Sequence, residues 1–279
     1  MRLIEIIKAI VLGIVEGITE WLPVSSTGHM ILLDEFISLN VSPEFMEMFL
    51  VVIQLGAILA VPTYFFERLN PFSASKSEAQ KKATLSLWGK VIVGAIPAAV
   101  LGLLLDDLLE KYLYTYFIVA LALVIYGVLF IIIEKVKSDS SYRVERAEDI
   151  SYTDALKIGA FQTLSLIPGT SRSGSTILGG MLSGVSRTAS AEFSFFMAIP
   201  IMLGASGLKI LKFILGGFTA SSTEIVLLLV GIAVSYIVSL VAIKFLMDFV
   251  KRHSFVPFGV YRIALGLLVL VYFLIRQLV

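Results

Sequence analysis

Six long apolar segments constrain the fold of this chain more than any other feature of its sequence. They cover residues 45–67, 86–106, 114–134, 188–213, 223–250 and 257–277. About 20 apolar residues are enough for a helix to cross the ~30 Å hydrocarbon core of a bilayer. Composition agrees, because 58% of the 279 residues are hydrophobic, 15% are charged and the mean hydropathy is +0.94. The sequence therefore predicts an all-α polytopic membrane protein with six transmembrane helices, forming a single integral membrane domain over residues 1–279.

Net charge and cysteine content narrow the possible functions. The formal charge is +1, so the whole-chain charge balance carries no information about nucleic acid, and nucleic acid is not among the partners that we expect. The absence of cysteine excludes disulfides and thiolate metal sites. The apolar N-terminal segment carries charged residues, among them Glu5 and Lys8, and no small-residue cleavage site follows it. We interpret it as mature protein rather than a signal peptide.

Two further apolar segments, at 3–38 and 153–184, are interrupted near their middle. The interruptions at 20–29 and 168–176 each contain a proline, glycine and several hydroxyl side chains. Irregular backbone at membrane depth is tolerated only where protein or water covers it. The pattern therefore predicts two re-entrant helical hairpins in addition to the six transmembrane helices.

The two interrupted segments resemble each other when one is shifted by 146 positions. Gly13, Glu16, Ser25 and Gly28 then coincide with Gly159, Gln162, Ser171 and Gly174. Each half of the chain would contain one hairpin followed by three transmembrane helices, and an odd number of crossings inverts the second half. We therefore expect an inverted repeat, covering about 1–135 and 151–279, with a site where the interrupted segments meet.

The distribution of lysine and arginine predicts the orientation. Three connecting segments that lie on one side of the predicted topology are basic, and this side is expected to be cytoplasmic. Their basic residues are Arg68, Lys76, Lys81, Lys82, Lys135, Lys137, Arg143, Arg146, Lys251 and Arg252. Three basic residues stand against the rule, because they fall on the predicted outer side: Arg2 at the N-terminus, and Lys209 and Lys212 near the end of the fourth transmembrane helix.

Two carboxylates precede the first interruption. Glu16 and Glu20 are four residues apart and share one face of a helix. Paired carboxylates persist at membrane depth with a cation between them, a shared proton or a water-filled cavity. A divalent cation with hard oxygen ligands, Mg²⁺ or Ca²⁺, satisfies the first condition. The alternative is that both side chains lie at the interface in headgroup water.

The residues after Pro23 are suited to phosphate chemistry. Ser25 or Ser26 can cap the next helix, whose first turn contains Thr27 and His29. A helix N-terminus binds phosphate through its free amides and its dipole. Ser26 and His29 are three residues apart, a spacing that suits a nucleophile and its base. Taken singly, the serines are equally explained as caps and the histidine as a hydrogen-bonded residue.

The second interruption, like the first, is followed by a predicted helix N-terminus, and here the first turn also contains an arginine. Thr170 or Ser171 can cap the helix, and Arg172 would lie in its first turn, where the helix dipole disfavours a cation. An anion would compensate, and guanidinium is the natural bidentate partner of phosphate. The predicted phosphate-binding residues are Ser25, Thr27, Ser171, Arg172, Ser173 and Thr176.

Both interruptions resemble the signature motifs of a known family. EGITEWLPVSSTGH at 16–29 and PGTSRSGST at 168–176 closely resemble the two motifs of the undecaprenyl-diphosphatase family, also called bacitracin resistance proteins (UppP/BacA). The likeness continues in VVIQLG at 51–56, GMLSGVSR at 180–187 and EFSF at 192–195, so it covers nearly the whole chain.

The resemblance implies a multi-pass enzyme of the bacterial inner (plasma) membrane, dependent on a divalent cation, with its active site facing the outer side. Its implied reaction converts undecaprenyl diphosphate, the lipid carrier of cell-wall synthesis, into undecaprenyl phosphate and inorganic phosphate, which also confers bacitracin resistance. Matching motif positions make Ser26, His29, Glu20 and Arg172 catalytic, and Glu16 and Glu20 metal ligands. The implied partners are a polyprenyl diphosphate lipid and the bilayer, and a homodimer stays open.

Two alternatives remain open from the sequence. Ser26 attacks the terminal phosphorus with His29 or Glu20 as its base, or an activated water attacks while Ser26 only binds the substrate. The runner-up function is a polyprenyl-phosphate flippase, since inverted repeats with interrupted helices also characterise secondary transporters. A flippase would have no need of a serine and a histidine beside the phosphate, which favours the enzyme.

Overall fold

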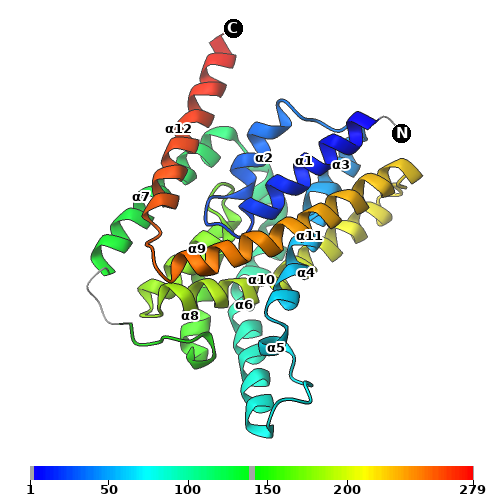
Figure 1. The fold of residues 1–279 in the computed structure, drawn as a ribbon. Helices are drawn as coiled ribbons and strands as arrows, with labels where there is room; N and C mark the ends of the chain where they lie inside the picture. The colour runs from blue at the N-terminus through cyan, green and yellow to red at the C-terminus, as the bar shows by residue number, and fades with distance from the viewer. Residues whose placement is uncertain (1–2, 138–141, 279) are drawn as a thin grey trace.

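The computed structural model describes residues 3–137 and 142–278, and this part of the chain is almost entirely helical (Figure 1). Its helices, in chain order, are α1 (Leu3–Thr19), α2 (Ser26–Asp34), α3 (Pro43–Val52), α4 (Gln54–Tyr64), α5 (Phe66–Leu69), α6 (Glu78–Leu113), α7 (Tyr116–Lys137), η1 (Ala147–Asp149), α8 (Tyr152–Gln162), η2 (Thr163–Leu166), α9 (Arg172–Leu182), α10 (Arg187–Leu215), α11 (Ser222–Val250) and α12 (Val256–Leu278).

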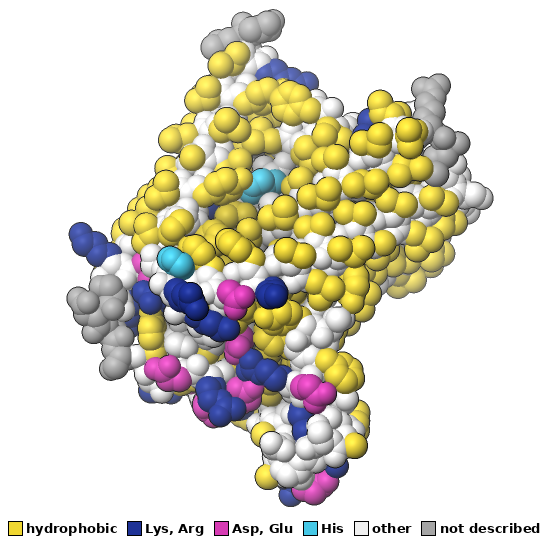
Figure 2. Space-filling view, in the orientation of Figure 1, with side chains coloured by type: hydrophobic (Ala, Val, Ile, Leu, Met, Phe, Trp, Pro, Cys, Tyr) yellow, Lys and Arg dark blue, Asp and Glu magenta, His cyan; other side chains and the backbone are white. Residues whose placement is uncertain are grey.

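The six predicted transmembrane segments are confirmed as helices long and apolar enough to cross a membrane. Within the described ranges they are the α3–α4 pair, α6, α7, α10, α11 and α12. Figure 2 shows apolar side chains over most of the visible face, with charged side chains gathered at its lower end, where α5 and the start of α6 project. This distribution is typical of a protein whose body lies in lipid and whose polar loops lie in water.

Helix α6 is longer than the apolar segment at 86–106 that predicted it. It begins at Glu78 because Ser77 and Gln80 form a capping box: the Gln80 amide donates to Ser77 Oγ at 3.3 Å, and the Ser77 amide donates to the Gln80 side-chain oxygen at 2.8 Å. The first two turns are polar and leave the lipid region, so hydropathy alone did not include them.

The two predicted interruptions are present, and their backbones are alike. Ser25 and Ser171 precede α2 and α9 with φ angles of 72° and 74°, a left-handed conformation that is strained for serine. Each hydroxyl caps its helix by accepting the amide of Gly28 at 3.3 Å or of Gly174 at 3.1 Å. Strained, capped turns of this kind are typical of ligand-binding sites, and both hold a helix N-terminus in the protein interior.

Each interrupted segment packs against a long helix from the other half of the chain. Helix α1 lies along α11, α8 lies along α6, and α7 pairs with α12 (Figure 1). Glycines permit the first two approaches: a Cβ at Gly13 would lie 2.8 Å from the Gly231 carbonyl oxygen, and a Cβ at Gly159 would lie 2.1 Å from that of Gly94. Small residues at such crossings let membrane helices pack backbone to backbone.

The α8–α6 crossing can be tested with a single methyl group. Gly159→Ala places its Cβ against the Gly94 backbone, so we expect a loss of about 1–3 kcal/mol in stability. The measurement is the thermal unfolding midpoint in one detergent. Gly204→Ala is the control, because a Cβ there meets nothing within 4 Å, and its midpoint should stay level or rise. Equal midpoints for the two variants would contradict this account of the packing.

Candidate active site

A cavity of about 550 Å³ lies where the two interruptions meet. Its walls come from both halves of the chain, including α1, α2 and α3 on one side and the start of α9 with the C-terminal half of α10 on the other. A second hollow, of about 680 Å³, lies on the surface at the end of α11 and contains none of the predicted site residues. The interior cavity is therefore the candidate site.

Six of the ten predicted site residues line this cavity. They are Glu16, Glu20, Ser26, Thr27, Ser171 and Arg172. The other four lie in the same two motifs but outside the lining, and they are Ser25, His29, Ser173 and Thr176. The fold thus brings together the predicted carboxylates, two hydroxyls of the first motif, one hydroxyl of the second and the predicted arginine.

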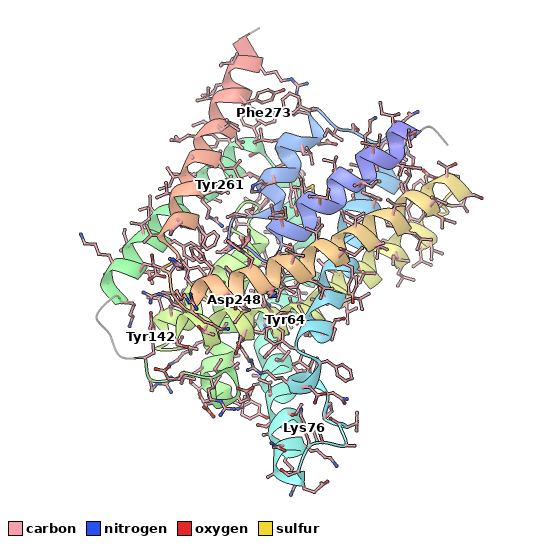
Figure 3. All side chains as sticks on the ribbon, viewed as in Figure 1. Tyr64, Lys76, Tyr142, Asp248, Tyr261 and Phe273 are labelled. Carbon is pink, nitrogen blue, oxygen red and sulfur yellow. The ribbon has the colours of Figure 1, made fainter. Side chains whose placement is uncertain are left out.

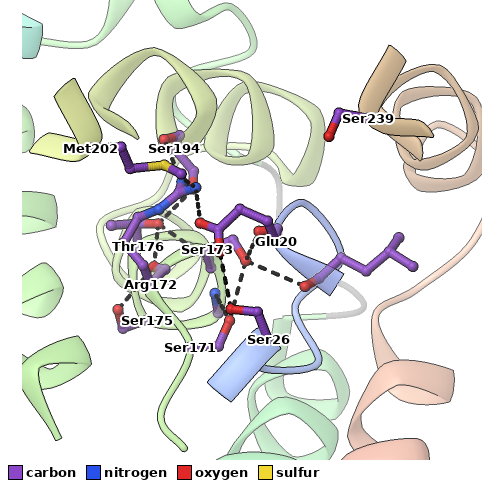
Figure 4. A network of polar contacts seen from close by, with 12 residues as sticks. Glu20, Ser26, Ser171, Arg172, Ser173, Ser175, Thr176, Ser194, Met202 and Ser239 are labelled. Atoms are coloured by element: carbon purple, nitrogen blue, oxygen red, sulfur yellow. Dashed lines mark hydrogen bonds and ion pairs between the residues drawn. The ribbon is translucent and has the colours of Figure 1, made fainter. Parts of the chain in front are cut away.

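The centre of the site is an ion pair between residues 152 positions apart (Figure 4). Arg172 Nη2 donates to Glu20 Oε1 at 2.8 Å, and the side chains are only 11% and 10% exposed. Arg172 Nη1 donates to the Ser194 carbonyl oxygen at 3.0 Å, and the guanidinium lies 5.4 Å from the Trp21 ring centroid. Arg172 Nε is buried and has no hydrogen-bond partner in this structure.

Ser26 is paired with Glu20 and not with His29. Ser26 Oγ donates to Glu20 Oε2 at 3.0 Å. Both ring nitrogens of His29 have other partners, the Ser25 carbonyl oxygen and the Tyr261 hydroxyl, each at 2.7 Å. Tyr261 lies on the part of α12 that faces α2, and its ring stacks on the imidazole (Figure 3). The spacing of Ser26 and His29 predicted a direct pair, but the carboxylate is the group positioned to accept the serine proton.

Ser173 and Thr176 hold the two turns in place. Ser173 Oγ donates to the Glu20 and Leu22 carbonyl oxygens at 3.3 and 3.4 Å, which ties the start of α9 to the first interruption. Thr176 Oγ1 donates to the Arg172 carbonyl oxygen at 2.9 Å and lies 2.6 Å from Ser194 Oγ. Like Ser25, which caps α2, both residues form their hydroxyl hydrogen bonds with other protein groups in this structure.

Glu16 and Glu20 fit a divalent cation. Glu16 is 1% exposed, its carboxyl group interacts directly with that of Glu20, and its Oε1 is buried without a partner. Within residues 3–137 and 142–278, no cluster of three acidic or histidine side chains exists that could bind a metal alone. Mg²⁺ commonly uses one or two carboxylates and completes its shell with water and substrate phosphate, which matches this donor set.

The cavity also contains charged residues that motif reasoning did not assign. Glu47 on α3 and Lys209 on α10 form an ion pair in its wall, and Lys212 lines the same wall. The signal for them was present in the sequence, because Lys209 and Lys212 are among the residues that oppose the positive-inside rule. Gln54, Tyr114 and Ser165 complete the polar part of the lining.

Fold and cavity together define a multi-pass membrane protein with a buried, polar, anion-compatible site between its helices. Sequence comparison places the chain within this class: the family model of "Bacitracin resistance protein BacA" matches residues 9–268, and the protein belongs to that family.

Proteins named undecaprenyl-diphosphatase are similar to this chain over all or nearly all of their length. The one from Desulfitobacterium hafniense is 55% identical over 280 residues, with 100% of both chains covered. One from Enterococcus faecalis is 57% identical, with 96% of both covered. That from Acetivibrio thermocellus is 55% identical, with 98% of this chain and 99% of the relative covered.

Proposed function

We propose that this protein hydrolyses undecaprenyl diphosphate to undecaprenyl phosphate and inorganic phosphate, and that this recycling of the cell-wall lipid carrier confers bacitracin resistance. Full-length relatives named for that activity support the proposal. The observation that carries it is the buried array of Ser26, Glu20 and Arg172, in which a serine donates to a carboxylate that is paired with an arginine. A nucleophile, a proton acceptor and a phosphate-binding cation are then present in one cavity.

In the proposed first step, Arg172 and the N-termini of α2 and α9 bind the diphosphate. Ser26 Oγ attacks the terminal phosphorus and transfers its proton to Glu20 Oε2. The bond from that phosphorus to the bridging oxygen breaks, and undecaprenyl phosphate leaves with the proton returned by Glu20. His29, held by Ser25 and Tyr261, keeps the first turn in place.

In the proposed second step, water gives a proton to Glu20 and attacks the phosphorus of phosphorylated Ser26. The Ser26 Oγ–phosphorus bond breaks, inorganic phosphate leaves, and Ser26 regains a proton from Glu20. Glu16 with Glu20 would hold Mg²⁺ or Ca²⁺, which supplies neutralisation of the diphosphate charge. The rival route, direct attack by water activated at Glu20, uses the same residues and leaves Ser26 as a ligand.

Phosphate release from undecaprenyl diphosphate tests both the activity and the route. Purified protein in detergent should release phosphate with Mg²⁺ or Ca²⁺, and lose this activity with chelator. Ser26→Ala should lower kcat by about 10³-fold or more if the serine is the nucleophile. A Ser26→Ala rate within tenfold of wild type would favour direct water attack. No release from folded wild-type protein would reject the phosphatase and favour the flippase.

The flippase is retained as the second candidate because of the packing of the two halves. Two observations support inverted repeats over about 1–135 and 151–279 with two re-entrant hairpins. Each interrupted segment packs on a helix of the other half, α1 on α11 and α8 on α6. The turns at Ser25 and Ser171 also have the same backbone conformation. Such repeats permit alternating access. Movement of a fluorescent polyprenyl phosphate across proteoliposomes, with and without chelator, would separate transport from hydrolysis.

We further propose that the protein lies in the bacterial inner membrane with its cavity open to the outer side. The basic loops support this orientation, since they lie at the end of the molecule where α5 and the start of α6 project. Reaction of an impermeant reagent with cysteines introduced into the naturally cysteine-free chain would test it. The homodimer stays a prediction.

A further inference from the structure

Arg262 is a buried arginine that the proposed reaction does not use. It lies within α12, in the predicted 257–277 transmembrane segment, and its side chain is 0% exposed. Ionisable residues inside membrane-crossing helices are costly and usually serve a site. The sequence signal was therefore available, although Tyr261 and Arg262 also suit an ordinary interfacial anchor.

The guanidinium of Arg262 binds both interruptions at once. Nη1 donates to the Pro23 carbonyl oxygen at 3.2 Å, and Nη2 donates to the carbonyl oxygens of Gly169 and Thr170, each at 2.9 Å. Pro23 and Gly169 differ by 146 positions, the same shift that superimposes Ser25 on Ser171. One planar group therefore connects equivalent points of the two turns, directly before the strained serines that cap α2 and α9.

The charge of Arg262 has no protein counter-ion among the described residues. Its hydrogen-bond acceptors in the described residues are the three carbonyl oxygens and no carboxylate, its Nε is buried without a partner, and its guanidinium carbon lies 5.7 Å from the centroid of the Tyr126 ring. A Cβ at Gly174 would lie 3.3 Å from Nη1, so the guanidinium lies against the first turn of α9. Gly169, one of its acceptors, lines the cavity. A positive group with this placement favours a polyanion in the cavity.

We propose that Arg262 is a positioning residue for the hydrolysis of the diphosphate. Its planar guanidinium group, hydrogen-bonded to both turns, fixes the distance between them. Ser26 after one turn and Arg172 after the other then face the same phosphorus. The proposal rests on the function proposed above. It predicts that geometry matters more than charge, because lysine supplies the same charge without a planar fork that can hold three carbonyl groups.

Arg262→Lys and Arg262→Gln are the test variants, and Arg276→Lys is the control. Arg276 lies on the same helix, 60% exposed and paired with Glu35. We expect Arg262→Lys to lower kcat by about 10²-fold, the effect of misplacing reacting groups by about 1 Å, while KM changes by less than about threefold. Arg262→Gln should be at least as impaired, and Arg276→Lys should stay within about twofold of wild type. Thermal midpoints establish that each variant is folded.

Two outcomes would overturn the proposal. The first is an Arg262→Lys variant that keeps more than half of the wild-type kcat, because charge alone would then suffice and no positioning by the fork would be needed. The second is a folded Arg262→Lys variant with unchanged kcat and a KM raised tenfold or more, which would make Arg262 a binding residue. If Arg262→Gln does not fold, the Arg262→Lys comparison still decides.

Inorganic pyrophosphate with Mg²⁺ separates this inference from the proposed function. Failure of the function would appear as an inactive wild type, whereas failure of the inference would appear only in the variants. With an inactive wild type, stabilisation of the protein by pyrophosphate replaces kcat as the readout. Positioning then predicts that Arg262→Lys and Arg276→Lys both keep their pyrophosphate affinity within about threefold of wild type, because Arg262 bonds the two turns and does not line the cavity. A loss of tenfold or more in Arg262→Lys alone would make Arg262 a binding residue and overturn the proposal.

Discussion

Arg172→Ala is expected to lower kcat/KM for undecaprenyl diphosphate by about 10³-fold or more, the loss seen when an arginine that stabilises a transferring phosphoryl group is removed. The position of Arg172 supports a large effect, because its side chain is only 11% exposed and lines the cavity, where a charge interacts more strongly than in bulk water. Arg172→Lys should recover part of the loss, since lysine keeps the charge but not the bidentate fork.

The same substitution leaves Glu20 without its ion-pair partner. An unpaired buried carboxylate costs about 3 kcal/mol or more, so Arg172→Ala should also unfold at lower temperature. Arg172→Ala combined with Glu20→Gln should regain stability without regaining activity. Arg276→Ala, at an exposed site, controls for the loss of an arginine. Activity within tenfold of wild type in folded Arg172→Ala would refute the assignment of phosphate binding to this residue.

Glu20→Gln is expected to lower kcat by about 10²–10⁴-fold. The amide keeps the size of the carboxyl group but cannot accept the proton of Ser26, which lies 3.0 Å from Oε2. It also weakens the cation site, so the Mg²⁺ concentration for half-maximal rate should rise. The measurement is initial rate against Mg²⁺ at saturating lipid.

Two matched variants make the Glu20 experiment specific. Glu47→Gln removes a carboxylate from the wall of the same cavity, where it pairs with Lys209, and should cost less than about tenfold. Glu16→Gln should raise the Mg²⁺ requirement with a smaller change in maximal rate, because the Ser26 hydroxyl donates to Glu20 rather than to Glu16. If Glu20→Gln and Glu47→Gln behave alike, Glu20 is not the proton acceptor.

The helical architecture was predictable because lipid solvation acts on each segment separately. Each of the six apolar stretches of about 20 residues forms a helix long enough to cross a membrane, and the breaks fall where proline and serine cluster. The polar start of α6 was missed, since a capping box at Ser77 extends the helix beyond the apolar region. Hydropathy carries no information about such caps.

The partners within the site were harder to predict than its members. Spacing along one helix suggested that Ser26 pairs with His29. In the structure the Ser26 hydroxyl donates to Glu20, and His29 forms a hydrogen bond with Tyr261. Spacing in the sequence does not show which of these possible partners each side chain uses. Ser173 and Thr176 were assigned to phosphate from their motif, and the structure turns their hydroxyls toward backbone carbonyls. Such choices depend on how α9, α10 and the first turn meet, which is a property of tertiary packing.

The 152 residues between Glu20 and Arg172 also affect how the protein enters the membrane. While the ribosome is still making the second half, the first half carries two neighbouring carboxylates without the arginine that pairs with Glu20 in the finished fold. These groups must then stay hydrated or protonated at the insertion machinery, because charged carboxylates partition poorly into lipid. Arrival of Arg172 supplies the missing partner, and the cavity wall is complete only once the residues of α10 have followed. The site is therefore assembled only after the second half of the chain has entered the membrane.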